Sequence, residues 1–277
     1  MTTKVVGRIP RTPDTVWWVT NTPAGAATIE LRLRPGEVTA EAWGPGAERQ
    51  LADVPSLIGL DDDPTAFRPQ PGLVADLHRR RLGLRLGRTG RVFETLLPAI
   101  LGQRVTIVEA ERSYRAIVRR FGVPAPGPID AWVPPQAETI ARLSYADLHP
   151  FGVERSRAGK LIEAARRAKR LEEAVHMDPH DAHARLIAVR GIGPWTAALV
   201  MGSALGDADA IPIGDYHIPN MVSWALAGEP RGDDARMLEL LEPYAGHRRR
   251  VLLLLKGAGI SAPKYGPKTA TRDIRSH

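Results

Sequence analysis

One segment of the chain contains an aspartate, a tryptophan and two glycines, which together could bind a charged substrate and catalyse a reaction on it. Gly191 and Gly193 flank Ile192 in the segment RGIGPWTA, and Asp215 lies 22 residues after Gly193. Glycines permit a tight turn whose backbone can come close to a binding partner. The carboxylate of Asp215 could stabilise positive charge that develops during a reaction, or orient an attacking water.

Helices must position these residues. The pattern LIAVRGIGPWTAALV predicts a helix, a glycine turn and a second helix, in whose first turn Pro194 is tolerated. The backbone N–H groups at that helix start lie at the positive end of the helix dipole, so they form a site for an anion such as phosphate. Asp215 precedes a further predicted helix, YHIPNMVSWALA, and helix capping is the alternative to a catalytic role.

The segments GIGPWTA and IPIGDYH, at this spacing, resemble the helix-hairpin-helix and Gly/Pro/Asp signature of a DNA glycosylase superfamily, HhH-GPD. They are most similar to its 3-methyladenine DNA glycosylase II branch. The resemblance implies that Asp215 is catalytic in a monofunctional base excision repair enzyme. Such an enzyme hydrolyses the N-glycosidic bond of a flipped, alkylated purine and leaves an abasic site. It also implies that Gly191, Ile192, Gly193 and Thr196 bind DNA.

The resemblance also implies a base pocket. Trp195 stands where bifunctional relatives carry a Schiff-base lysine, and its ring could stack on a cationic purine or merely cover the core. Tyr244 resembles a second pocket aromatic, with core packing as its alternative. Leu199 stands where some relatives carry a further aromatic. A DNA lyase stays open, because Lys160 or Lys256 could reach the sugar.

A second DNA-binding segment is ILGQRVT, within an amphipathic helical stretch that starts at Phe93 and ends at Gly122. It resembles a turn that penetrates the duplex in the family, with Gln103 in the turn. The following residue in relatives is often an apolar wedge that fills the gap left by the extruded nucleotide. Here it is Arg104, which could fill that gap, hydrogen-bond within it, or contact a phosphate.

The predicted fold is mostly α with a small N-terminal β-rich domain, an α+β class. Residues 28–34 alternate polar and apolar side chains, as a half-buried strand does, and VTAEAW continues as its partner. We expect a β-rich domain over 1–85, a helical glycosylase region over 86–262, and a basic, flexible tail over 263–277. By resemblance, a cleft between helical halves holds Asp215. The Pro-rich stretch VPAPGPIDAWVPPQ is expected to be an ordered loop.

Composition is consistent with a protein that meets a polyanion, because the formal charge is +7 and the sequence pI is near 10.0. We expect double-stranded DNA with a damaged base as the partner. Arginines crowd positions 79–91, and Arg155, Arg157 and Lys160 follow on a later helix; both groups could contact phosphate or simply be solvated. A noncatalytic protein that binds lesions or abasic sites is the alternative to an enzyme.

The chain has no cysteine, which excludes a cluster held by four cysteines and a thiolate metal site. No cofactor is expected. In the family a monovalent cation often binds the hairpin through main-chain carbonyls, here those around Ile187, Val189 and Gly191. The N-terminus lacks the apolar core of a signal peptide, and no apolar run is long enough to span a membrane. We therefore expect a cytoplasmic protein of bacterial type. The family resemblance implies a monomer that associates with the nucleoid through DNA.

Overall fold

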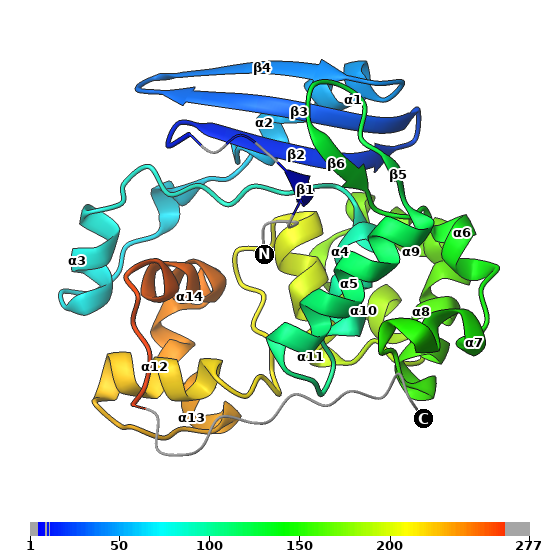
Figure 1. The fold of residues 1–277 in the computed structure, drawn as a ribbon. Helices are drawn as coiled ribbons and strands as arrows, with labels where there is room; N and C mark the ends of the chain where they lie inside the picture. The colour runs from blue at the N-terminus through cyan, green and yellow to red at the C-terminus, as the bar shows by residue number, and fades with distance from the viewer. Residues whose placement is uncertain (1–4, 9, 11, 264–277) are drawn as a thin grey trace. The chain divides into compact units, whose positions relative to one another are not determined.

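The computed structural model describes residues 5–8, 10 and 12–263, which divide into two compact units. The first unit contains the described residues up to Pro55 together with Arg91–Glu173, and the second contains Ser56–Gly90 together with the described residues from Ala174 onward. Helices predominate, with two three-stranded sheets (Figure 1), so the predicted α+β class is confirmed. The domain boundaries drawn from the sequence stay a prediction, and 264–277, nearly all of the expected tail, lies outside the described residues.

The larger sheet of the first unit is antiparallel, in the order β2-β3-β4 (Figure 1). Its strands are β2 (Thr15–Thr22), β3 (Gly25–Arg34) and β4 (Glu37–Trp43), and helix α1 (Ala47–Ala52) packs against β3 and β4. The pairing of 28–34 with VTAEAW is confirmed. Ile29 and Leu31 are buried, as the alternation predicts, but Thr28 is buried as well.

The second sheet corrects one expectation, because the Pro-rich connector is not only a loop. It contains β5 (Val123–Pro124) and β6 (Asp130–Val133), and β6 lies between β5 and β1 (Val6–Arg8). Alternate residues of β6, Ala131 and Val133, are buried in a core with Trp17 and Val19. Packing against residues distant in the chain thus stabilises a strand in this connector, although its local sequence is typical of turns.

The helical part of the first unit is built around α4, whose residues are mostly buried, none of them being exposed. They are α4 (Val92–Leu101), α5 (Ile107–Phe121), α6 (Ala137–Ala141), α7 (Tyr145–Leu148), α8 (Arg155–Arg166) and α9 (Ala168–Glu172). The carboxylate of Glu172 accepts the N–H groups of Val92 and Phe93, both at 2.8 Å, and so caps α4. Helices α5, α8 and α9 all pack against α4.

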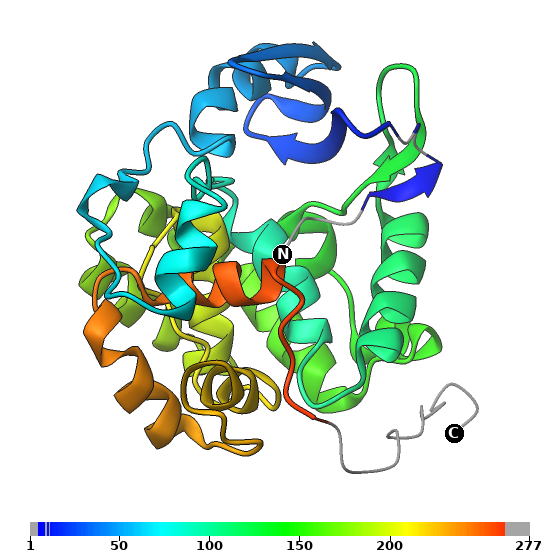
Figure 2. The same ribbon diagram turned by 90° about the vertical axis from the view of Figure 1, so that its left-hand side faces the viewer.

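The second unit is built around helix α14, which carries the run VLLLLK. Its helices are α3 (Leu73–Arg79), α10 (Pro179–Ile187), α11 (Pro194–Val200), α12 (Ile218–Ala227), α13 (Asp234–Leu241) and α14 (Arg248–Gly257). The short α2 (Val54–Leu57) spans the boundary of the units. Helices α3 and α14 pack together (Figures 1 and 2), and α12, α13 and α14 share one apolar core. The interpretation of VLLLLK as a buried helix is confirmed.

Most arginines of positions 79–91 contact the protein itself. Arg88 pairs with Asp61 at 2.8 Å, Arg91 pairs with Asp53 at 2.6 Å, and Arg85 donates to the carbonyl of Asp62 at 2.6 Å. The arginine run is therefore largely structural.

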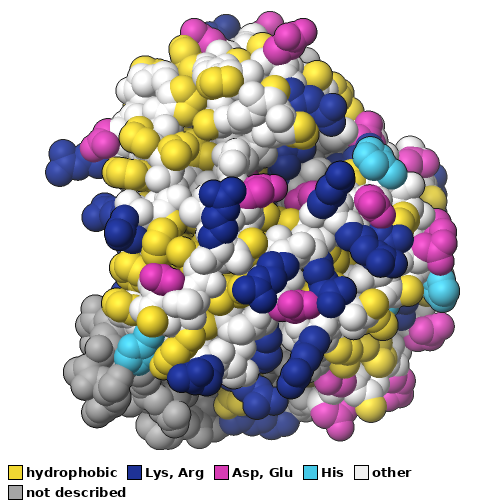
Figure 3. Space-filling view, turned by 90° about the vertical axis from the view of Figure 1, so that its right-hand side faces the viewer, with side chains coloured by type: hydrophobic (Ala, Val, Ile, Leu, Met, Phe, Trp, Pro, Cys, Tyr) yellow, Lys and Arg dark blue, Asp and Glu magenta, His cyan; other side chains and the backbone are white. Residues whose placement is uncertain are grey.

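One face of the protein carries Lys and Arg side chains with acidic ones among them (Figure 3). Among the described residues, no helix is long and apolar enough to cross a membrane.

Glu94 is a carboxylic acid enclosed within the first unit. Its Oε2 accepts hydrogen bonds from the Thr20 hydroxyl at 2.7 Å and the Asn21 N–H at 3.3 Å, whereas Oε1 is buried without a hydrogen-bond partner among the described residues. Desolvation raises the pKa of Glu94 to about 7, although these bonds and Arg91 oppose the shift. Folding therefore favours the neutral acid.

We expect Glu94→Gln to remove this source of pH dependence. Because the pKa rises from 4.5 to about 7 on folding, the stabilisation is fully present below the lower value and is lost as pH rises to the higher one. A shift of roughly 2.5 units corresponds to about 3 kcal/mol. Denaturant unfolding should give the wild type and Glu94→Gln equal free energies of unfolding at a pH of about 4. At a pH of about 8 the variant should have the higher free energy of unfolding. Parallel curves across this range would contradict the prediction.

Candidate active site

The predicted helix-turn-helix is present in the second unit. Helix α10 ends at Ile187, the N–H of Ile192 donates to the carbonyl of Val189 at 3.0 Å, and α11 begins at Pro194. Gly191 has a φ of 99°, a left-handed conformation that favours glycine, whereas Gly193 is extended at −91°. The first glycine of the turn therefore adopts a conformation that favours glycine, and the second does not require one.

The side chains of the turn differ in exposure. Ile192 is buried and anchors the turn in the core, and Thr196 is buried in the first turn of α11. Gly193 is exposed, and a Cβ at this position would have no neighbour within 4 Å. The backbone of Gly193 is thus open to a partner, and its binding of DNA, like that of Gly191, Ile192 and Thr196, stays a prediction. A monovalent cation at the main-chain carbonyls around Ile187, Val189 and Gly191 also stays a prediction.

Asp215 is held through both oxygens of its carboxylate. Oδ1 accepts the backbone N–H groups of His217 at 2.8 Å and Ile218 at 2.9 Å, which caps the start of α12. Oδ2 accepts the indole N–H of Trp195 at 2.9 Å. Capping and catalysis are therefore compatible roles, because the cap occupies one oxygen and fixes the direction of the other.

The bond between Trp195 and Asp215 is the contact that sequence reasoning missed. Trp195 was expected to stack on a base or to cover the core, and its ring is indeed half-buried, but its N–H donates to the carboxylate from the first turn of α11. Leu199, one turn later on α11, is also half-buried. The only sequence signal for the bond is that a buried indole N–H needs an acceptor.

Tyr244 lies elsewhere in the second unit. It packs against the core shared by α12, α13 and α14, with its ring 6.4 Å from that of Phe67. Desolvation raises the pKa of Tyr244. The structure thus gives Tyr244 the packing role that was its alternative, and a contact with a base stays a prediction.

The segment that leads to Asp215 is fixed by charged groups. Helix α11 continues into a π-helical turn, Met201–Leu205, and the following loop is held by an ion pair between Asp209 and Arg248, whose Nε lies 2.8 Å from Oδ1. The N–H of Gly214, where φ is 86°, donates to Asp234 at 3.0 Å. The position of Asp215 therefore depends on the starts of α13 and α14 as well as on α11.

Helix α14 carries several cationic residues, of which Arg249 and Lys256 are seven residues apart and therefore lie on one face of the helix. Desolvation lowers the pKa of Lys256, while Asp215 opposes the shift and Arg249 adds to it. Arg249 packs against Gly202, where a Cβ would lie 2.2 Å from Nε, and its Nη1 is buried without a hydrogen-bond partner among the described residues. Nothing in the sequence singled out Arg249 within the run RRR. Sequence reasoning indicated Lys256 only as an amine that could reach the sugar.

The remaining predicted DNA-binding residues belong to the first unit. Gln103 and Arg104 lie in the turn between α4 and α5, where Oε1 of Gln103 accepts from Lys160 at 3.0 Å. Arg104 is exposed and has a φ of 57°, in the left-handed region. Arg157 is neither solvated nor available to phosphate, because it is buried and donates to the carbonyl of Leu101 at 2.8 Å.

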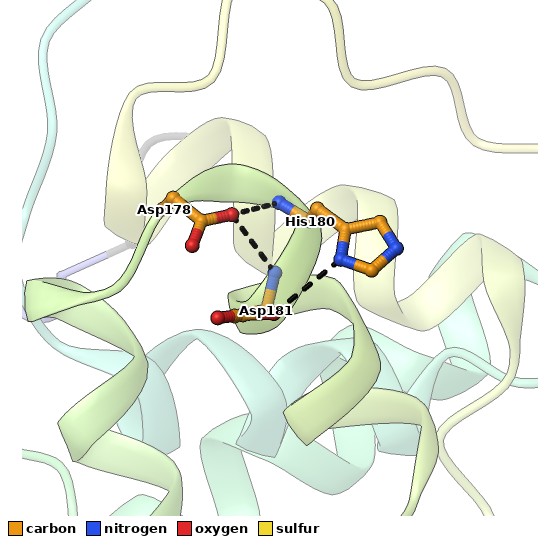
Figure 4. A group of neighbouring side chains, drawn as sticks. All are labelled: Asp178, His180 and Asp181. Atoms are coloured by element: carbon orange, nitrogen blue, oxygen red, sulfur yellow. Dashed lines mark hydrogen bonds and ion pairs between the residues drawn. The ribbon is translucent and has the colours of Figure 1, made fainter.

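One further group of polar side chains has an explanation in the fold. Atoms of Asp178, His180 and Asp181 lie within 4.8 Å of one another at the start of α10 (Figure 4), and all three residues are exposed. Asp178 accepts the N–H groups of the other two at 3.0 and 3.1 Å. This arrangement is that of a helix N-cap.

Comparison with known proteins identifies the family of this chain. The model of the HhH-GPD superfamily base excision DNA repair proteins matches residues 97–245, which include the Gln103 turn, the hairpin and Asp215. The chain belongs to the HhH-GPD superfamily. A DNA-3-methyladenine glycosylase of Bacillus subtilis is 33% identical over 195 residues, which are 67% of this chain and 64% of that protein. The chain spans between 33% and 56% of the length of other curated relatives that it matches.

Solved structures with this HhH-GPD fold are similar over most of the chain. A 3-methyladenine DNA-glycosylase from Archaeoglobus fulgidus aligns with a TM-score of 0.73 at 24% identity, covering 91% of this chain and 88% of that one. A Clostridium acetobutylicum 8-oxoguanine glycosylase/lyase, in complex with DNA, aligns with a TM-score of 0.63 at 17% identity, covering 88% of both chains. At these identities the likeness establishes the fold.

The capping role of Asp215 predicts a stability difference. Asp215→Ala removes the acceptor for the N–H groups of His217 and Ile218, which should lower the free energy of unfolding by about 1–2 kcal/mol. Asp215→Asn keeps one acceptor oxygen and should lower it less. Urea unfolding of the three proteins measures both values. If Asp215→Ala is as stable as the wild type, the cap contributes nothing.

Proposed function

We propose that this protein is a monofunctional DNA glycosylase that hydrolyses the N-glycosidic bond of alkylated purines of the 3-methyladenine type. The observation that carries the proposal is the anchored carboxylate of Asp215, which accepts the N–H of Trp195 from the second helix of the hairpin in an HhH-GPD chain. The curated relative named as a DNA-3-methyladenine glycosylase supports this substrate class.

The chemistry suits a fixed carboxylate. As the base leaves, positive charge builds on the deoxyribose, and a negative charge already in place stabilises that state without reorganisation. Because one oxygen caps α12, the carboxylate cannot turn away from the sugar when the bond breaks. Asp215 can also orient the attacking water, whose proton is lost as the new C–O bond forms. The products are the free base and an abasic site.

The test is single-turnover release of base from duplex DNA that contains one 3-methyladenine or one hypoxanthine. Asp215→Asn should lower the rate constant by about 10² to 10³, because it removes the negative charge. Asp233→Asn is the matched control, since Asp233 also caps a helix of the second unit and its side chain accepts from Arg236. Tight binding without release, unchanged by Asp215→Asn, would instead support a noncatalytic protein that binds lesions.

The absence of a lyase step has a separate test. Trp195 has no amine, but Lys256 lies within the electrostatic influence of Asp215 and its pKa is lowered by desolvation, so it is the lysine to examine. We expect borohydride to trap no covalent adduct between the protein and a duplex with an abasic site. An adduct that forms with the wild type and with Lys160→Met, but not with Lys256→Met, would show that the enzyme is bifunctional.

A further inference from the structure

Arg249 on helix α14 differs from the arginines on either side of it in the contacts of its guanidinium. Arg248 pairs with Asp209, and Arg250 pairs with Asp62 at 2.6 Å. Arg249 has no carboxylate partner among the described residues, and its Nη1 is buried without a hydrogen bond. Desolvation lowers the pKa of Arg249, although carboxylates of the same unit oppose the shift. A charged group that loses water without gaining a partner is costly, so its presence here requires an explanation.

The backbone beside Arg249 leaves room for that guanidinium. The side chain lies against Gly202, where a Cβ would be 2.2 Å from Nε and 2.7 Å from Cδ. The φ of Gly202 is not positive, so glycine is required here for space and not for backbone conformation. Gly202 belongs to the π-helical turn Met201–Leu205, which follows α11 directly. Such turns are rare and occur frequently at functional sites.

The same face of α14 extends from Arg249 to the neighbourhood of Asp215. Arg249 and Lys256 lie on this face, about 10 Å apart along the helix axis. Desolvation lowers the pKa of Lys256, and the charges of both Asp215 and Arg249 act on it. A molecule that is held at Asp215 and extends along α14 would therefore reach the guanidinium of Arg249.

A flipped base offers the kind of acceptor that this guanidinium requires. A guanidinium carries only donors. A phosphate stays in the DNA backbone, whereas a base that leaves the stack enters the enzyme, where a buried Nη1 can meet it. A purine with an oxygen at C6 presents two adjacent acceptors, O6 and N7, which an arginine binds with both arms of its fork. An adenine presents N7 beside an amino group that donates, so it satisfies the guanidinium less well.

We propose that Arg249 donates to O6 and N7 of a flipped 6-oxopurine and is a residue that determines the specificity of the enzyme. This inference rests on the proposed function. The glycosidic bond lies at Asp215, and C6 lies at the opposite end of the purine, toward Arg249. When the bond between C1′ and N9 breaks, its electron pair goes to the base, and the guanidinium stabilises the negative charge that spreads to N7 and O6. Water supplies a hydroxyl to C1′, and the proton of that water neutralises the base.

The experiment measures single-turnover release of two neutral bases from otherwise identical duplexes. One base is hypoxanthine, and the other is unsubstituted purine, which lacks the oxygen at C6. The ratio of the two rate constants should fall about ten- to a hundredfold in Arg249→Met, because a bidentate arginine contact discriminates between bases by about that factor. Intrinsic differences between the two leaving bases cancel when this ratio is compared with that of the wild type. Arg249→Lys keeps the charge but not the fork, so it should keep part of the ratio.

Gly202→Ala tests the same contact without altering any charge. Its Cβ would displace the guanidinium of Arg249, which is the movable end of a flexible side chain, and alanine is compatible with the backbone at this position. The ratio should fall as it does in Arg249→Met. Arg236→Met is the matched control, because Arg236 lies on α13 of the same unit and pairs with Glu229 at 2.7 Å. It should leave the ratio at the wild-type value.

Several outcomes would overturn the role of Arg249. Equal losses of both rate constants in Arg249→Met would show a structural role, and an unchanged ratio in Arg249→Met or in Gly202→Ala would show that the contact is not made. Thermal unfolding checks that each variant is folded, and Gly202→Ala decides if Arg249→Met is not. A wild type that releases 3-methyladenine but neither neutral base contradicts this inference and leaves the glycosylase standing, whereas one that releases none of the three contradicts both.

Discussion

The hydrogen bonds to the carboxylate of Asp215 are the constraint on which the rest of the second unit depends. One oxygen must meet two N–H groups at the start of α12, and the other must meet the indole N–H of Trp195 on α11. Both conditions hold only if α11, the following loop and α12 keep one arrangement. The ion pair of Asp209 with Arg248 and the shared core of α12, α13 and α14 maintain it.

Charge in this protein serves the fold as much as any partner. Arg250 is 1% exposed and pairs with Asp62 at 2.6 Å, and Arg157 is buried against the carbonyl at the end of α4. Breaking such a pair would leave an uncompensated buried charge. The net charge of +7 therefore overstates the charge that is available to DNA. Arg104, which is exposed, stays a predicted DNA contact.

The features predicted best from the sequence are those that depend on residues close together in the chain. The glycine turn, the helix that starts at Pro194 and the cap by Asp215 follow from short patterns, and the Gln103 turn follows from the family resemblance. The structure has each of them. What could not be predicted depends on partners distant in the chain. Strand β6 is stabilised because Ala131 and Val133 pack in one core with Trp17. Trp195 donates to Asp215 across a π-helical turn and a loop, which separate the two residues in the chain.

The measurement that tests the account most directly is a double-mutant cycle on the single-turnover rate of base release. Trp195→Phe keeps an aromatic ring and removes only the N–H that holds Asp215. A hydrogen bond to a charged group contributes about 1.5–3 kcal/mol, so we expect a loss of roughly tenfold or more in the wild type and no further loss in Asp215→Asn. Equal losses in both backgrounds would show that Trp195 acts independently of Asp215, and would contradict the account.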